Sequence, residues 1–247
     1  MKRSIIFLIL ILVLTRCSDN FLDLAPISNS SVQNFYSNEG DFTNAIYGAY
    51  STLRSNGLYS DYFQLVGELR SDNAEMGSTA SDRFYFFNLQ EFTDQVTNVI
   101  NENIWNKCYL GILRVNEILD RIDKLSASES FKGRITGEAK FLRGLFYFNL
   151  VRVFGDVPFT TTVFKTIEEA YEAGRTEKSE VYKQIIEDLL DAERLLPLQV
   201  KGEEGRATTG AASALLGKVY LTIKDFNNAR IKLTDVINSN QYQLLTN

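Results

Sequence analysis

Apolar residues recur every three or four positions through much of the chain, which is the spacing of one face of an α-helix. Such a pattern runs from Asp41 to Leu53, with Asp41 as the expected N-cap and Gly57 just beyond the last turn. The longest amphipathic stripe begins near Asn103 and consists of Trp105, Cys108, Ile112, Val115, Leu119 and Ile122. The pattern predicts a protein that is mainly all-α.

The segment from Gly137 to Phe154 is the most apolar part of the chain after the first residues. Its apolar side chains cover most of the helical circumference, so we expect this helix to be buried on nearly all sides. It also carries charged residues, which argue against a membrane span: Glu138, Lys140, Arg143 and Arg152. Glu138 and Arg143 need partners in such a setting, and we interpret both as structural. The turn residues of 155–158 end the helix.

A further helix is predicted over Lys178–Leu196, where Pro197 marks the stop. The last helix pair follows a glycine-rich link at 202–205 and shows the spacing of the tetratricopeptide unit, which repeats every ~34 residues. The residues at these signature positions are Leu216, Gly217, Tyr220 and Ala229. Small residues are needed where two antiparallel helices cross. We therefore predict tetratricopeptide-like helix pairs, with loop insertions such as 155–175.

Helical periodicity is lost from Leu65 to Gln95, and we interpret this part as an extended, looped excursion. It contains the densest aromatic cluster of the chain, in which the candidate ligand-binding residues are Arg83, Phe84, Tyr85 and Phe86. Binding sites for glycans combine flat aromatic faces with amide, carboxylate and arginine side chains. The alternative is that a strand or a short helix packs these rings into the core.

The N-terminal residues have the layout of a secretory signal. Lys2 and Arg3 are followed by an unbroken apolar run, Ile5–Leu14, and then by Cys17. A membrane-spanning helix needs about 20 apolar residues, so this run is too short to cross a bilayer. We predict a lipoprotein signal at 1–16, a lipidated tether at 17–40 that starts at Cys17, and a helical domain at 41–247. Arg16 departs from the usual small residue before such a cysteine, and the alternative is an ordinary signal peptide cut elsewhere.

Composition narrows the range of functions. The formal net charge is −5, and no basic stripe is present, so nucleic acid is not an expected partner. The chain has no histidine, which removes the usual general base and most catalytic zinc sites. Apart from Cys17 there is only Cys108, which we interpret as a small buried hydrophobic residue. We expect no cofactor and no catalytic activity.

Carboxylates accompany the aromatic cluster, and they leave one enzymatic alternative open. Glu68, Asp72 and Glu75 could act as the acid and base of a surface glycosidase if two of them converged in a cleft at about 5 to 10 Å. Scattered carboxylates on a solvated loop are the simpler interpretation. Asp225 to Asn228 lack the ligand pattern of a calcium loop, and Asp225 is expected to be the N-cap of the last helix.

Several blocks along the sequence are informative when they are taken together. The first lie near the anchor and in the first long helix: Cys17–Asp19, Trp105 with Tyr109, and Asn116–Leu119. The main block runs from Gly137 through Arg143 and Tyr147 to Pro158. The later blocks are Val181–Tyr182, Ile185–Ile186, Asp188–Leu189, Leu196–Pro197 and Gly210–Leu221. Together these blocks resemble the N-terminal portion of SusD/RagB-family outer-membrane lipoproteins, and they occur in the family's order across nearly the whole chain after Cys17.

This resemblance implies a surface-exposed protein that captures oligosaccharides or peptides and sits on a SusC-like TonB-dependent transporter, held in the outer membrane by its lipid anchor. Family members are usually about twice as long, and we expect the chain to be a truncated form. A second hypothesis is a tetratricopeptide-like envelope adaptor without affinity for glycans.

Overall fold

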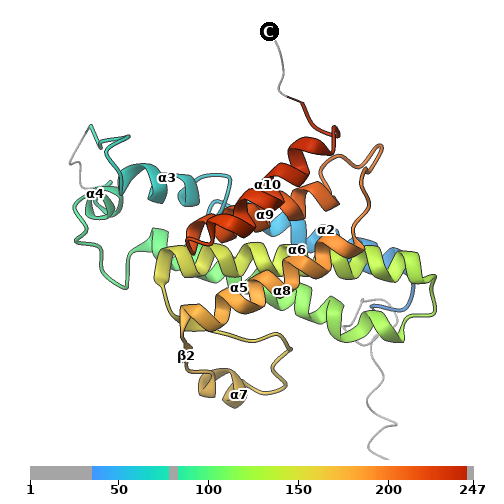
Figure 1. Ribbon diagram of the computed structural model, residues 1–247. Coiled ribbons are helices and arrows are strands. Elements are labelled where there is room, and N and C mark those ends of the chain that lie inside the picture. The colour runs from blue at the N-terminus through green and yellow to red at the C-terminus, as the bar shows by residue number, and fades with distance from the viewer. Residues whose placement is uncertain (1–34, 78–82, 244–247) are drawn as a thin grey trace, which may run out of the picture. The chain divides into compact units, whose positions relative to one another are not determined.

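The first helix of the described residues begins at a capping box. The computed structural model describes residues 35–77 and 83–243, and α2 spans Glu39–Leu53 (Figure 1). Asn38 is its N-cap and accepts a hydrogen bond from the backbone N–H of Asp41, whose carboxylate accepts one from the Asn38 backbone in return. The predicted cap at Asp41 was therefore three residues late, because Asp41 is the second half of a capping box.

Two short helices occupy parts of the expected loop between residues 65 and 95. α3 spans Tyr62–Leu69 and α4 spans Phe84–Gln90. Neither helix was predicted from the sequence, because each lasts only about two turns, too few for a helical period to show. Tertiary packing supports α4, since its Leu89 is fully buried and its Phe86 ring meets Tyr62 of α3 edge-on. The interpretation of 65–95 as extended was wrong in this respect.

The two longest helices form the centre of the bundle. α5 (Val99–Arg121) starts at the N-cap Asn98 and runs into a short 3-10 helix, η2 (Ile122–Lys124). α6 (Glu129–Phe154) starts at Ser128, earlier than predicted. α6 packs against α5 on one side and α8 on another, and also against α2 and α9. This position explains why its apolar residues surround the helix, as the sequence pattern predicted.

The remaining helices stack in chain order. α8 (Lys178–Leu195) packs on α6, α9 (Thr209–Thr222) packs on α8, and α10 (Phe226–Asn238) packs on α9 (Figure 1). Asp225 caps α10 by accepting from the Asn228 backbone N–H, as predicted. The crossing of α9 and α10 is close, because a Cβ on Gly217 would lie 2.6 Å from Leu233 Cγ. The all-α, tetratricopeptide-like prediction is confirmed.

A loop insertion separates α6 from α8. Gly155 ends α6 with a φ of 74°, a region that suits glycine. β1 (Val157–Pro158) then pairs antiparallel with β2 (Arg175–Thr176), and α7 (Ile167–Glu172) lies between them in the chain. Side chains of the long helices hold the insertion by its backbone: the Tyr147 hydroxyl donates to Thr160 O at 2.8 Å, and the Tyr109 hydroxyl donates to Pro158 O at 2.6 Å.

The two buried charges of α6 have partners on other elements. Arg143 forms an ion pair with Asp188 of α8. The fully buried Glu138 accepts from Arg206, in the segment between α8 and α9, and from Arg134 one turn earlier in α6. The structural interpretation of Glu138 and Arg143 is supported, and the partners come from segments that the sequence pattern did not connect with them.

Candidate functional site

The predicted aromatic cluster forms the short helix α4. Arg83 is the residue before its first turn and is exposed, while Phe84 is 44% exposed. The Phe84 and Tyr85 ring centroids are 3.8 Å apart. Tyr85 and Phe86 are half-buried, and the backbone carbonyl of Tyr85 accepts a hydrogen bond from the Asn98 side chain at 3.0 Å. The cluster therefore divides into an exposed edge at Arg83 and Phe84 and a part, Tyr85 and Phe86, that is half-buried.

The segment that joins α4 to α5 exposes further apolar surface. Phe92 is 70% exposed and Val96 is 96% exposed. Phe92 has a φ of 53°, which is uncommon for a bulky residue. Its backbone is fixed nonetheless, because its N–H donates to Leu89 O and the Thr93 N–H donates to Asn88 O. The segment thus presents apolar side chains to solvent from an ordered turn.

A cavity of about 440 Å³ lies beside this segment. It is lined by Asp94, Gln95, Val96, Asn101, Glu102, Trp105 and Phe154. We call it the Trp105 cavity. Its walls come from the segment before α5, the first two turns of α5, and the last residue of α6. The close packing of α5 on α6 brings Phe154 to the tryptophan although 49 residues separate them in sequence.

Trp105 is the single tryptophan of the chain and is half-buried. Its ring meets Phe154 edge-on, with the centroids 5.1 Å apart, and lies 5.0 Å from the Tyr109 ring. Aromatic contacts of this geometry restrict the ring and add to the energy of its burial. The indole is therefore held in place at the wall of the cavity.

The polar side of the cavity is built around Asp94. Its carboxylate accepts from the Arg70 guanidinium at 2.8 Å and from the Asn101 amide. Within the described residues, the buried Asn101 Oδ1 and Arg70 Nε have no hydrogen-bond partner. Such buried polar atoms are uncommon in native structures. Asn101 and Arg70 thus retain hydrogen-bonding capacity beside the cavity.

An indole ring, two amides and two carboxylates suit a ligand with both apolar and hydroxyl-bearing faces. A sugar ring has this character, since its C–H face packs on aromatic rings and its hydroxyls donate and accept hydrogen bonds. The described residues contain no group of three His, Cys, Asp or Glu side chains arranged to hold a metal ion. The cavity is therefore a candidate binding site for a saccharide.

This cavity was not predicted from the sequence, because the apolar period assigns Trp105 to the buried stripe of α5. The buried position is Ile104, and Trp105 lies beside it on the half-exposed side. A signal was present, since Asn101 and Glu102 precede Trp105 by four and three residues and so share a helix face with it. The other contributors, Asp94 and Phe154, depend on packing.

The remaining predicted residues fall into three groups. Cys17, the lipidation candidate, lies outside the described residues, as does the signal at 1–16. Cys108 is fully buried in α5, and burial raises the pKa of its thiol, in agreement with its interpretation as a core residue. Glu68 lies in α3, and Asp72 and Glu75 are exposed after it. None of these three carboxylates lines the Trp105 cavity.

Two SusD-like proteins match nearly the whole of this chain in sequence. A SusD-like protein of Formosa agariphila is 29% identical over 96% of this chain and 46% of its own length. A SusD-like protein of Bacteroides ovatus is 28% identical over 96% of this chain and 44% of its own length. The chain thus spans about half the length of the curated relatives it matches.

Solved structures agree with the sequence matches. A laminarin-binding SusD-like protein superimposes with a TM-score of 0.78 at 31% identity, covering 85% of this chain and 47% of that one. A SusD-like protein of Bacteroides fragilis gives a TM-score of 0.77 at 30% identity, covering 90% and 42%. The SusD-like family model described as "Starch-binding associating with outer membrane" matches residues 20–221. With most of its length matched, the chain belongs to the SusD-like family.

Proposed function

We propose that this protein binds oligosaccharide nutrients at the Trp105 cavity and passes them to a SusC-like TonB-dependent transporter in the outer membrane. The observation that carries the proposal is the composition of the cavity, where a held indole faces amide and carboxylate groups. The laminarin-binding relative supports the ligand class, and the description of the family supports the membrane.

The exposed edge of α4 is proposed to extend this site. Arg83 supplies a guanidinium and Phe84 an aromatic face, both exposed, and the Asn98 side chain ties α4 to the start of α5. Tyr85 and Phe86 hold the helix in place through their packing. In this arrangement Arg83 and Phe84 contact ligand, and Tyr85 and Phe86 position them.

Fluorescence of the single tryptophan tests the proposal directly. Because the protein has one indole, a saturable change in emission reports an event at or near the cavity. The purified protein is titrated with laminarin, maltodextrin and xylan oligosaccharides and with a set of short peptides. We expect saturable binding of at least one glycan, confirmed by calorimetry, and no response to peptides.

Variants separate contact residues from scaffold residues. Trp105→Ala is expected to weaken glycan binding about tenfold, the loss of roughly 1.4 kcal/mol of aromatic contact. Phe84→Ala and Glu102→Gln are expected to weaken it by smaller factors while leaving the melting temperature unchanged. Tyr171→Ala on α7 is the matched control, since Tyr171 is 87% exposed and belongs neither to α4 nor to the lining of the Trp105 cavity. If the protein bound none of the glycans and none of the peptides, the envelope-adaptor hypothesis would be favoured instead.

The membrane attachment is a separate part of the proposal. The signal at 1–16, acylation of Cys17, a tether at 17–40 and a helical domain at 41–247 would place the binding domain outside the cell. None of the described helices combines the length and the apolar character that a membrane span requires. Mass spectrometry of the mature N-terminus in wild-type protein and in Cys17→Ser tests this step, and a terminus without fatty acid would refute it.

A further inference from the structure

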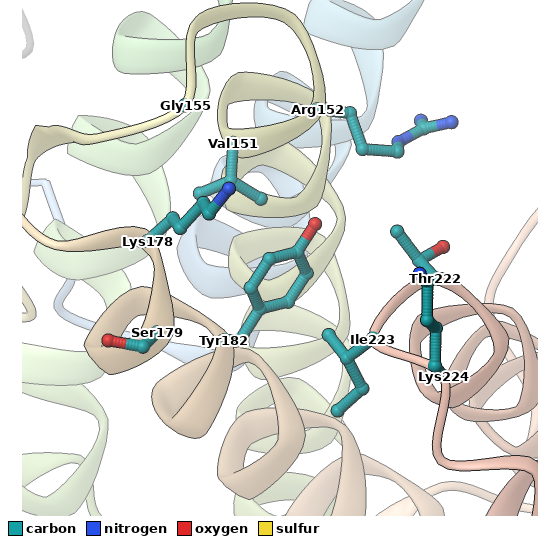
Figure 2. Close-up of a pocket in the computed structure, with 9 residues that line it drawn as sticks. All are labelled: Val151, Arg152, Gly155, Lys178, Ser179, Tyr182, Thr222, Ile223 and Lys224. Carbon is teal, nitrogen blue, oxygen red and sulfur yellow. The ribbon is translucent and has the colours of Figure 1, made fainter.

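A second cavity, of about 740 Å³, shares no lining residue with the Trp105 cavity and lies where α6 ends, α8 begins and α9 turns into α10 (Figure 2). Its polar lining consists of Arg152, Lys178, Ser179, Tyr182, Thr222 and Lys224. We call it the cationic cavity, because its three charged residues are all basic. They come from three different segments, which only the stacking of α6, α8 and α9 brings together.

The charge of this cavity is unusual for the protein that contains it. The chain has a formal net charge of −5, yet no carboxylate lines the cavity. Within residues 35–77 and 83–243, none of the ion pairs involves Arg152, Lys178 or Lys224. Three carboxylates lie next to these cations in the chain or by contact, and each accepts a hydrogen bond: Glu177 from the Ser179 hydroxyl, Asp156 from the Lys178 backbone N–H at 3.0 Å, and Asp225 from Asn228.

Arg152 is held in one orientation. Its guanidinium lies 4.2 Å from the centroid of the Phe148 ring and 5.2 Å from that of Phe63. It donates to Asn149 Oδ1 at 2.9 Å, and Asn149 is itself hydrogen-bonded to the Tyr59 hydroxyl. An arginine fixed by stacking loses less entropy when it binds an anion than a free one does.

Tyr182 provides the neutral donor of the cavity. Figure 2 shows its ring among the lining residues, with the hydroxyl directed towards the α6 residues Val151 and Arg152. The ring packs edge-on against Phe148, with centroids 6.4 Å apart. Burial raises the pKa of its hydroxyl, so the group stays protonated and able to donate.

We propose that the cationic cavity is a subsite for acidic saccharides, meaning sugars that carry a carboxylate or a sulfate ester. The positive charges of Lys178, Lys224 and Arg152, which border the cavity on different sides, would attract the oxyanion. The Tyr182 and Ser179 hydroxyls would bind ring hydroxyls, and the apolar side chain of Ile223 would contact a sugar C–H face. The proposal rests on the proposed function only for the class of ligand, a saccharide. Its test therefore measures binding at the cationic cavity and not at the Trp105 cavity.

The expected signature is electrostatic. Exposed lysines attract an anion through a field that salt screens, so binding of an acidic sugar here weakens as ionic strength rises. Calorimetric titrations at about 50 and about 500 mM NaCl use three probes: a galacturonate oligosaccharide, a sulfated galactan oligosaccharide and a neutral laminarin oligosaccharide. We expect the acidic probes to bind with salt-dependent affinity and the neutral probe to show no such dependence. Comparison of the galacturonate probe with the sulfated galactan probe distinguishes the two sources of negative charge, a carboxylate and a sulfate ester.

Charge-neutralising variants locate the effect. Lys178→Gln and Lys224→Gln are each expected to weaken acidic probes about threefold, and the double variant about tenfold, as for exposed charge pairs worth below 1 kcal/mol each. Lys183→Gln is the matched control: Lys183 lies on α8 too, pairs with Glu180 at 2.7 Å and does not line the cavity. Trp105→Ala should leave binding of the acidic probes unchanged.

The outcomes separate the two proposals. Acidic probes that bind no better than the neutral probe, or a double variant that matches wild type, would overturn the cationic subsite. Binding to vesicles containing phosphatidylglycerol but not to acidic sugars would also overturn it and indicate a lipid headgroup site. If the protein did not bind neutral glycans but still bound the acidic probes in a way that depends on Lys178 and Lys224, only the Trp105 site would be contradicted.

Discussion

Arg143 of α6 and Asp188 of α8 form a two-pronged ion pair inside the bundle, with Nε–Oδ2 and Nη2–Oδ1 both at 2.7 Å. Their side chains are 6% and 1% exposed. Arg143 also donates to Asn116 of α5 and to the backbone carbonyl of Thr161 in the insertion. One side chain thus connects α5, α6, α8 and the 155–177 insertion.

Asp188→Leu should be strongly destabilising because it leaves a buried, unpaired guanidinium. Breaking a buried pair in this way costs about 3–5 kcal/mol, so we expect a drop of this size in the free energy of unfolding measured by urea titration. The double variant Arg143→Met with Asp188→Leu should lose less. Glu180→Ala, which breaks an exposed pair on the same helix, should cost less than about 1 kcal/mol. Equal losses for Asp188→Leu and Glu180→Ala would contradict the structural role of the pair.

Gly217→Ala should destabilise the last helix pair although alanine favours helices. The added Cβ would lie 2.6 Å from Leu233 Cγ, so the Leu233 side chain or the helices must shift, at a cost of about 1–3 kcal/mol. Gly48→Ala in α2 is the control with the opposite sign, because a Cβ there meets nothing within 4 Å and should stabilise by roughly 0.5–1 kcal/mol. Thermal unfolding followed by circular dichroism measures both. Restoration of stability in Gly217→Ala by Leu233→Ala would identify the contact.

Glu203 should contribute acid-sensitive stability. Hydrogen bonds from Arg134, Arg206 and Tyr47 lower the pKa of its carboxyl from the usual 4.5 to about 2. The folded state thus favours the ionised form, so the contribution is complete above about pH 4.5 and is lost as pH falls towards 2. Glu203→Gln should lower the melting temperature at neutral pH, and its difference from wild type should shrink over this range. A difference that stays constant down to about pH 3 would be inconsistent with this linkage.

Cys108 should be unreactive in the folded protein. Its side chain is fully buried, and burial raises the pKa of the thiol, so the reactive thiolate is rare at neutral pH. In a Cys17→Ser background, iodoacetamide should label Cys108 slowly until urea unfolds the protein, and then quickly. The ratio of the two labelling rates, followed by intact mass, measures this protection. Fast labelling without denaturant would show that α5 opens locally.

Local sequence signals determined most of the helical framework. The period of apolar residues predicted α2, α5, α6 and α8, and the small residues at Gly217 and Ala229 predicted the crossing of α9 and α10. Capping chemistry identified Asp225 correctly and placed the start of α2 three residues late, since Asn38 and Asp41 share one capping box. These features could be predicted because a helix face and a cap depend on residues a few positions apart.

The tertiary structure decided which distant side chains meet. Asp188 reaches Arg143 across 45 residues, Arg206 reaches Glu138 across 68, and Phe154 completes the wall beside Trp105. α3 and α4 are helices because their aromatic side chains pack on the protein, not because two turns show a period. Both cavities likewise arise where elements from separate parts of the chain converge. Periodicity gives the face that a helix buries, whereas packing of whole helices determines what that face contacts.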